Sequence, residues 1–262
     1  MWNTLIQNTG IISLIITIAA LGLLPILCAL LWKRYCKENV SFRTLLFGVA
    51  GFLLYALILK LGNHILGPTG IIRSTIVYCI MTGGIEECSR YVIIRYIMKK
   101  NKTKENMVMY GIGHGGIEIW STTLLSLACL LIIMIMGTRG MESDILYFLI
   151  TAGVTPIPFA EPMMKFILAA GESFNIGIGM LYVFEKLVGM FFQIDFTILI
   201  AYGIIKHKKK YLPLAILVHV IVNMMHIMII MSSWTWYLLL SICVVILTIW
   251  AKQLYKQMVM IE

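Results

Sequence analysis

Charged residues lie inside apolar sequence where the tetrapeptide Gly-Gly-Ile-Glu occurs twice, in TGGIEECSR at 82–90 and in GHGGIEIW at 113–120. In the first stretch Glu86 and Glu87 precede Arg90 by four and three residues, so on a helix both carboxylates can pair with the guanidinium group. Two carboxylates that face one guanidinium leave a surplus negative charge. We therefore expect one carboxyl group to be protonated, hydrated or bound to a metal ion.

Imidazole groups occur at helical spacing from other polar side chains in two further apolar stretches. His114 lies four residues before Glu118, so on a helix the two share one face and can bind one metal ion or one water molecule. Later in the chain, His219, Asn223 and His226 follow at i, i+4 and i+7, which is also one stripe. A lone histidine in a membrane helix is more often a packing residue, but these two patterns beside the Glu-Glu-x-x-Arg stretch indicate a functional site.

The composition excludes an ordinary soluble domain. Of the 262 residues, 60% are hydrophobic and 13% are charged, whereas soluble domains carry about 25% charged residues. The net charge of +9 does not indicate nucleic-acid binding, because the basic residues form short clusters between apolar runs, as topology signals do. The six cysteines show no CxxC spacing, and we interpret them as packing residues.

Apolar runs long enough to cross a hydrocarbon core of about 30 Å define the predicted fold. We predict an all-α, polytopic transmembrane helical bundle of about seven spans, within a range of six to eight. We expect one integral-membrane domain over 1–262, with no nucleic-acid partner and the lipid bilayer around it. The predicted spans are 9–32, 44–66, 73–98, 107–137, 175–206, 213–232 and 234–251.

Basic residues gather in alternate connections between the predicted spans and after the last span. The positive-inside rule then places the N-terminus outside and the C-terminus in the cytoplasm of a multi-pass protein of the cell membrane. The segment 143–170 is apolar but is interrupted by Pro156 and Pro158, and if it crossed the membrane every later basic loop would change sides. We therefore expect it to be a re-entrant or interfacial segment on the outer face.

Counting residues from the predicted cytoplasmic ends places polar groups of several spans at one depth. Glu87, Glu118 and Asn223 each lie about 15–17 Å deep at 1.5 Å per residue, and Asp195 falls in the same layer. This convergence predicts a polar active-site cavity in the cytoplasmic half of the bundle. Glycines beside both carboxylate stretches would allow close approach of neighbouring helices or of an extended substrate. These glycines are Gly83, Gly84, Gly111, Gly113, Gly115 and Gly116.

The motifs resemble those of a known clan of membrane proteases. Glu86-Glu87-Cys88-Ser89-Arg90, His114-Gly-Gly-Ile-Glu118 and His219-Val-Ile-Val-Asn223 are similar to the EExxR/K, HxxxE and HxxxD/N motifs of the PrsW and CAAX-protease (CPBP) intramembrane protease clan. The sequence GIGHGGIE most resembles the YhfC branch, an intramembrane metalloprotease family of bacteria. Its pattern has Glu-Arg and Asp where this chain has Glu185-Lys186 and Asn223. The resemblance covers about 40–232.

The resemblance implies hydrolysis by an activated water molecule. Two histidines and one carboxylate match a catalytic zinc site with an open position. In this version Glu87 is the base, and Asn223 and Arg90 are polarising or orienting groups. In a metal-free version Glu87 and His114 activate the water, while His219 and Asn223 stabilise the oxyanion. The implied catalytic residues are Glu86, Glu87, Arg90, Glu118 and Asn223, the implied ligands of Zn²⁺ are His114, His219 and Glu118, and supporting partners or a third ligand are Glu185, Gln193, Asp195 and His226.

We therefore expect an intramembrane endopeptidase that cuts a membrane-embedded or lipidated peptide near the cytoplasmic leaflet. One alternative is a proton- or cation-coupled transporter, because buried Glu, His and Asp residues can relay protons. Transporters often show paired repeats, and no duplication of whole helices is evident in this sequence. A further alternative, which the resemblance also suggests, is a non-catalytic membrane protein of the bacteriocin-immunity type.

Overall fold

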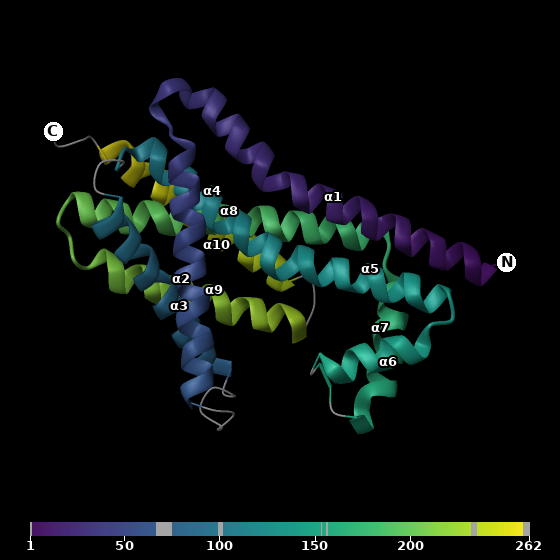
Figure 1. The fold of residues 1–262 in the computed structure, drawn as a ribbon. Helices are drawn as coiled ribbons and strands as arrows, with labels where there is room; N and C mark the ends of the chain where they lie inside the picture. Colours follow the sequence, from purple (N-terminus) through teal and green to yellow (C-terminus); the bar gives the residue numbers. More distant parts are fainter. Residues whose placement is uncertain are drawn as a thin grey trace. The chain divides into compact units, whose positions relative to one another are not determined.

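A computed structural model describes residues 2–66, 75–98, 102–152, 154–155, 157–231 and 235–258, which form helices and short connections with no strand among them (Figure 1). The predicted all-α class is confirmed. A segment in lipid must pair its own backbone N–H and C=O groups, and a helix does so. The α-helices are α1 (Trp2–Cys36), α2 (Phe42–Leu66), α3 (Thr75–Val92), α4 (Lys104–Glu118), α5 (Leu125–Thr138), α6 (Glu142–Thr151), α7 (Ala160–Ser173), α8 (Ile176–Ile205), α9 (Tyr211–Met231) and α10 (Thr235–Gln257). Short 3₁₀ segments occur at Lys37–Asn39 and Ile157–Phe159, and π-helical segments at Ile93–Ile97 and Ile119–Leu124.

Within the described residues, five helical stretches are long and apolar enough to cross a membrane. Each overlaps a predicted span. The apolar part of α9 is shorter, and α3 carries three charged residues in its second half. The total of seven spans therefore stays a prediction. The five stretches are Thr9–Cys36, Phe42–Gly62, Lys104–Thr138, Ile176–Ile205 and Leu238–Gln257.

The segment predicted to be re-entrant or interfacial contains two short helices. The helices α6 and α7 have 10 and 14 residues. At 1.5 Å per residue these lengths give about 15 and 21 Å, less than the roughly 30 Å of a hydrocarbon core. Ile145 and Leu149 of α6 pack with Met164 of α7 and Ile133 of α5. Such a helical pair fits the expectation for 143–170, although its position in the membrane stays a prediction.

The chain divides into two compact units, one formed by residues 1–24 and 119–186 and the other by residues 25–118 and 187–262. The second unit holds the Glu-Glu-x-x-Arg, His-x-x-x-Glu and His-x-x-x-Asn motifs. The Glu185-Lys186 pair belongs to the first. The single domain over 1–262 stays a prediction.

Glycines bring α2 and α4 into close contact in the second unit. A Cβ atom at Gly48 would overlap the carbonyl oxygen of Tyr110 and lie 2.7 Å from the backbone nitrogen of His114, and one at Gly113 would overlap the Leu45 backbone. At Gly111 a Cβ atom would lie 2.6 Å from Cα of Ile194 in α8. The backbones of three helices thus approach one another beside His114, as small residues permit in membrane bundles.

The other glycines singled out from the sequence differ in how closely neighbouring helices approach them. A Cβ atom at Gly83 would meet Val220 of α9 at 3.1 Å, one at Gly115 would meet Gln193 at 3.3 Å, and one at Gly116 would meet Pro25 at 2.8 Å. Gly84, in contrast, has no heavy atom within 4 Å of that position among the described residues. It lines a groove of about 270 Å³ between α2 and α3 instead.

We predict that Gly48→Ala destabilises the protein by about 1–3 kcal/mol, because the added methyl group meets backbone atoms that cannot rotate away. Gly62→Ala in the same helix is the matched control, because no heavy atom of the described residues lies within 4 Å of a Cβ atom there. Thermal unfolding of the two variants in detergent measures the difference. Equal transition temperatures would contradict the close α2–α4 contact.

Candidate active site

Three charged residues of α3 lie in the interior of the second unit. The exposed fractions are 5% for Glu86 and 0% for Glu87 and Arg90. The Arg90 Nη2 atom donates to Glu86 Oε1 at 3.2 Å, and Arg90 Nε lies 3.5 Å from Glu87 Oε2. The spacing predicted this pairing, because side chains three and four residues apart meet on one face of a helix.

The rest of the Arg90 guanidinium group contacts α8. Its Nη1 atom donates to the Gln193 carbonyl oxygen at 2.9 Å and to Thr197 Oγ1 at 3.2 Å, and Nη2 also donates to Gln193 Oε1. The Phe196 ring centroid lies 5.9 Å from Arg90 Cζ. One buried cation thus joins α3 to a single face of α8.

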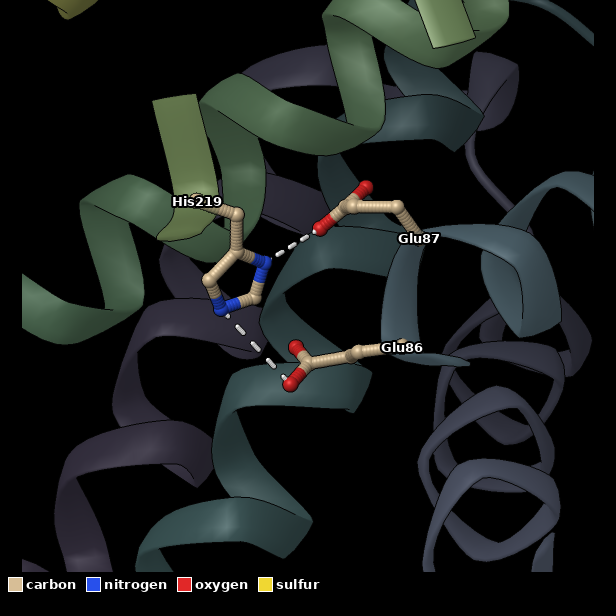
Figure 2. Close-up of side chains that lie close together, drawn as sticks. All are labelled: Glu86, Glu87 and His219. Atoms are coloured by element: carbon tan, nitrogen blue, oxygen red, sulfur yellow. Dashed lines mark hydrogen bonds and ion pairs between the residues drawn. The ribbon is translucent and has the colours of Figure 1, made fainter. Parts of the chain in front are cut away.

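His219 of α9 completes the centre of this cluster. Its Nδ1 atom lies 2.7 Å from Glu87 Oε1 and its Nε2 atom lies 3.7 Å from Glu86 Oε2, so the imidazole ring faces both carboxylates (Figure 2). The Phe196 ring stacks on the imidazole with a centroid distance of 4.7 Å and an interplanar angle of 7°. This stacking restricts the rotation of His219.

His114 of α4 reaches the same cluster through Glu86. Its Nε2 atom lies within hydrogen-bond distance of Glu86 Oε1, at 3.0 Å, and its side chain is fully buried. The Tyr110 ring stacks on the imidazole at 6.2 Å, and Phe52 of α2 contacts it edge-on at 5.6 Å. His114 Nδ1 and the Tyr110 hydroxyl make no hydrogen bond within the described part of the chain.

Gln193 connects Glu118 with Glu86. Its Nε2 atom donates to Glu86 Oε1 at 3.0 Å and to Glu118 Oε2 at 2.8 Å. Since Arg90 donates to the Oε1 atom of the same amide, the orientation of the Gln193 side chain is fixed. Glu118 is only partly buried and lies at the border of the cluster.

Two other predicted site residues, Asn223 and Asp195, make their hydrogen bonds outside the cluster. Asn223 is one helical turn beyond His219, and its Nδ2 atom donates to Thr82 Oγ1 of α3 at 3.2 Å. Asp195 accepts a hydrogen bond from Thr248 of α10 at 2.6 Å and lines a separate apolar groove.

Two further predicted partners fall outside the cluster as the structure describes it. Glu185 pairs with the adjacent Lys186 at 2.8 Å, in the other compact unit. The side chain of His226 lies outside the described residues. The roles of both stay predictions.

The donor set suits a divalent metal ion. Glu86, Glu87 and His219 each offer one ligand atom, and these three atoms lie within 4.8 Å of one another. Glu87 Oε2 is buried, lies 3.5 Å from Arg90 Nε and makes no hydrogen bond within the described residues, so the carboxylate retains capacity to accept a further contact. Carboxylate oxygen and imidazole nitrogen are ligands that Zn²⁺ takes in proteins.

This set shares only His219 with the ligands proposed from the sequence. His114 and Glu118, which we expected to be ligands, contact Glu86 and Gln193. The polar active-site cavity in the cytoplasmic half of the bundle stays a prediction. Sequence reasoning did not identify Tyr110, Phe196 or Thr197; an aromatic residue one turn before His114 was the only available signal for Tyr110.

The helices and the buried carboxylate–imidazole cluster define a multi-pass membrane protein with a candidate catalytic centre. The model of the YhfC intramembrane metalloprotease family matches residues 20–247, and the chain belongs to this family. It is 24% identical over 231 residues to the uncharacterized membrane protein YhfC of Bacillus subtilis (strain 168), with 84% of each chain covered. No solved structure matches the chain.

We predict that Arg90→Met destabilises the protein by about 3–5 kcal/mol, because the substitution leaves two buried carboxylates without their cation. Arg95→Met is the matched control, because Arg95 lies in the π-helical segment that directly follows α3 and is only half-buried. Unfolding in detergent, followed by circular dichroism, measures both. Similar stability of the two variants would contradict the role of Arg90 in holding the cluster.

We also predict that the protein binds one Zn²⁺ ion and that His219→Ala weakens binding more than 100-fold. Losing a partner that only supports a ligand costs roughly 10–100-fold, so a lost ligand should cost more. His207→Asn is the control, because His207 lies outside the cluster at a φ of 53°, a conformation that Asn tolerates. Equilibrium dialysis with metal analysis measures affinity. Equal binding by both variants would place the metal elsewhere.

Proposed function

We propose that the protein is an intramembrane peptidase that hydrolyses a membrane-embedded or lipidated peptide by means of water activated in the Glu86, Glu87 and His219 cluster. The observation that carries this proposal is the approach of the three ligand atoms to within 4.8 Å, in residues at most 5% exposed. Membership of the YhfC family, described as intramembrane metalloproteases, supports it.

In this proposal Glu86, Glu87 and His219 would hold a Zn²⁺ ion. When bound, such an ion polarises a carbonyl group and makes a water molecule more acidic. Glu86 and Glu87 together carry one negative charge more than Arg90 neutralises, which favours a cation at this place.

Glu87 is the proposed proton acceptor. Its Oε1 atom faces His219 and would be the oxygen that holds the ion. Its Oε2 atom, 3.5 Å from Arg90 Nε, makes no hydrogen bond in the described part of the chain and would accept a water proton. As the water oxygen bonds to the peptide carbonyl carbon, its proton passes to Glu87. The carboxyl group then returns the proton to the amide nitrogen, and the C–N bond breaks to give a carboxylic acid and an amine.

Neighbouring side chains hold the reacting groups in place. Asn223, one turn from His219, is the proposed donor to the oxyanion, and it needs only to exchange its bond to Thr82. Arg90 contacts both carboxylates and fixes their direction without touching the peptide. His114 and Gln193 hold Glu86 from the opposite helices.

The burial of the cluster affects how a substrate would enter. Because Glu86, Glu87 and His219 are at most 5% exposed, the protein excludes lipid and bulk water from them. A peptide therefore reaches them only when the helices around the cluster separate locally. We further propose that the cluster lies in the cytoplasmic half of the bilayer, with the N-terminus outside and the C-terminus in the cytoplasm.

We expect purified protein in lipid vesicles to cleave members of a panel of single-span membrane peptides, with products identified by mass spectrometry. Glu87→Gln should lower the rate by about 10²–10⁴, because it removes the proton acceptor but keeps the shape. Glu161→Gln, in an exposed ion pair with Lys165, is the matched control.

Two results would contradict the proposed function. One is an equal rate for Glu87→Gln and wild type. The other is proton movement across the vesicle membrane that Glu87→Gln abolishes while no peptide is cut, since that result would identify a transporter.

A further inference from the structure

A second site lies on the side of α8 that carries Asp195. A groove of about 700 Å³ runs between the C-terminal half of α1 and helices α4, α8 and α10, all within the second compact unit. This volume is in the range of roughly 300–1,000 Å³ typical of ligand sites. Apolar side chains of three of these helices line it, among them Leu31, Ile112, Phe191 and Ile194.

The groove has a cationic end. Lys252 and Lys256 of α10 line it, both are exposed, and the structure shows no ion pair for either among the residues it describes. Lys104, which lies over the Tyr255 ring at 5.1 Å, differs in that it has Glu105 as an ion-pair partner at 4.0 Å. The groove therefore offers two lysines that have no ion-pair partner in the described part of the chain, next to a long apolar surface.

Aromatic side chains place this end at the membrane surface. Trp32, Tyr35 and Tyr255 line the groove beside the lysines. Trp and Tyr concentrate where the hydrocarbon core meets the head groups, because their rings are apolar and their N–H or O–H groups are polar. The Trp32 Nε1 atom donates to the Glu105 carbonyl oxygen at 2.9 Å, so the ring is fixed in position.

The acidic group in the groove does not cancel this charge. Asp195 is 2% exposed and its carboxylate accepts the Thr248 hydroxyl at 2.6 Å. Thr248 lies four residues before Lys252 on α10, so Thr248 is about 6 Å deeper in the membrane than Lys252. An anion bound by the lysines would thus lie at the surface, and the part of the ligand at the depth of Asp195 is apolar or polar without charge.

We propose that this groove binds one anionic phospholipid, with an acyl chain along Leu31, Ile112 and Phe191 and the phosphate at Lys252 and Lys256. Basic pockets between membrane helices bind lipid head groups in this way. Leu31 and Phe191 are 66% and 43% exposed, so the groove opens to the surrounding lipid and a chain enters from the side. The site is separate from the carboxylate–imidazole cluster and does not depend on the proposed peptidase activity.

Cys28 reports on occupancy, because its thiol lines the groove. In the experiment, full-length protein is placed in phosphatidylcholine vesicles with increasing fractions of phosphatidylglycerol and treated with N-ethylmaleimide. Peptide mass spectrometry gives the alkylation rate of each cysteine. We expect phosphatidylglycerol to slow the alkylation of Cys28 and to leave Cys88 unchanged, because Cys88 is exposed and lines a different groove.

Substitution of the lysines tests the head-group contact. Removing a lysine at the surface weakens anionic-lipid binding about five-fold, so Lys252→Gln combined with Lys256→Gln should weaken it about thirty-fold. Lys209→Gln combined with Lys210→Gln is the matched control, a pair of exposed lysines in the connection between α8 and α9.

Three results would overturn the proposal. The first is that phosphatidylglycerol slows the alkylation of Cys28 and Cys88 equally. The second is that the two double-lysine variants lose protection of Cys28 to the same extent. Either result would mean that the surface potential alone is responsible. The third is protection in pure phosphatidylcholine that grows with the ratio of protein to lipid, which would mean that a second copy of the chain fills the groove.

Discussion

The guanidinium group of Arg90 is the interaction on which the interior of this protein depends. A charged side chain at the centre of a membrane helix costs about 2.5–3.5 kcal/mol when it is unpaired, and α3 carries three such residues within one and a half turns. Arg90 contacts both carboxylates of its own helix and three acceptors on Gln193 and Thr197 of α8. Few rotations of α3 against α8 satisfy all these contacts, so the neutralisation of charge also sets the geometry.

The carboxylates that Arg90 fixes then determine the positions of the histidines. Glu86 accepts contacts from α4 and α8 as well as from its own helix, and Glu87 holds the ring of His219. The glycine contacts between α2 and α4 are a second requirement, since they bring the backbone next to His114 close enough to exclude lipid. Electrostatic pairing and close packing therefore support the same cluster from different sides.

The sequence predicted the part of this site that depends on spacing along one helix. The pairing of Glu86 and Glu87 with Arg90, the all-α class and the broken segment around Pro156 and Pro158 follow from local periodicity and composition. Counting residues also gave a common depth for several polar groups. Depth is only one coordinate, however, and the rotation of each helix about its axis depends on contacts with others.

Asp195 and Gln193 show why rotation matters. The two residues are at nearly the same depth, yet Gln193 donates to Glu86 while Asp195 lines the apolar groove with Thr248. The same reason explains why His114 meets Glu86 rather than pairing with its own neighbour Glu118. Spacing identifies which side chains share a face, but not which face of another helix lies opposite.

The partners of Arg90 constrain how the chain enters the bilayer during its synthesis. The ribosome releases α3 more than 100 residues before Gln193, Thr197 and His219 exist to contact it. Until then only its own two carboxylates can compensate the guanidinium, and α3 is not among the described stretches that are long and apolar enough to cross a membrane. If α3 crosses the bilayer as the sequence predicts, its stable integration must follow the arrival of α8 and α9, and these later helices complete it.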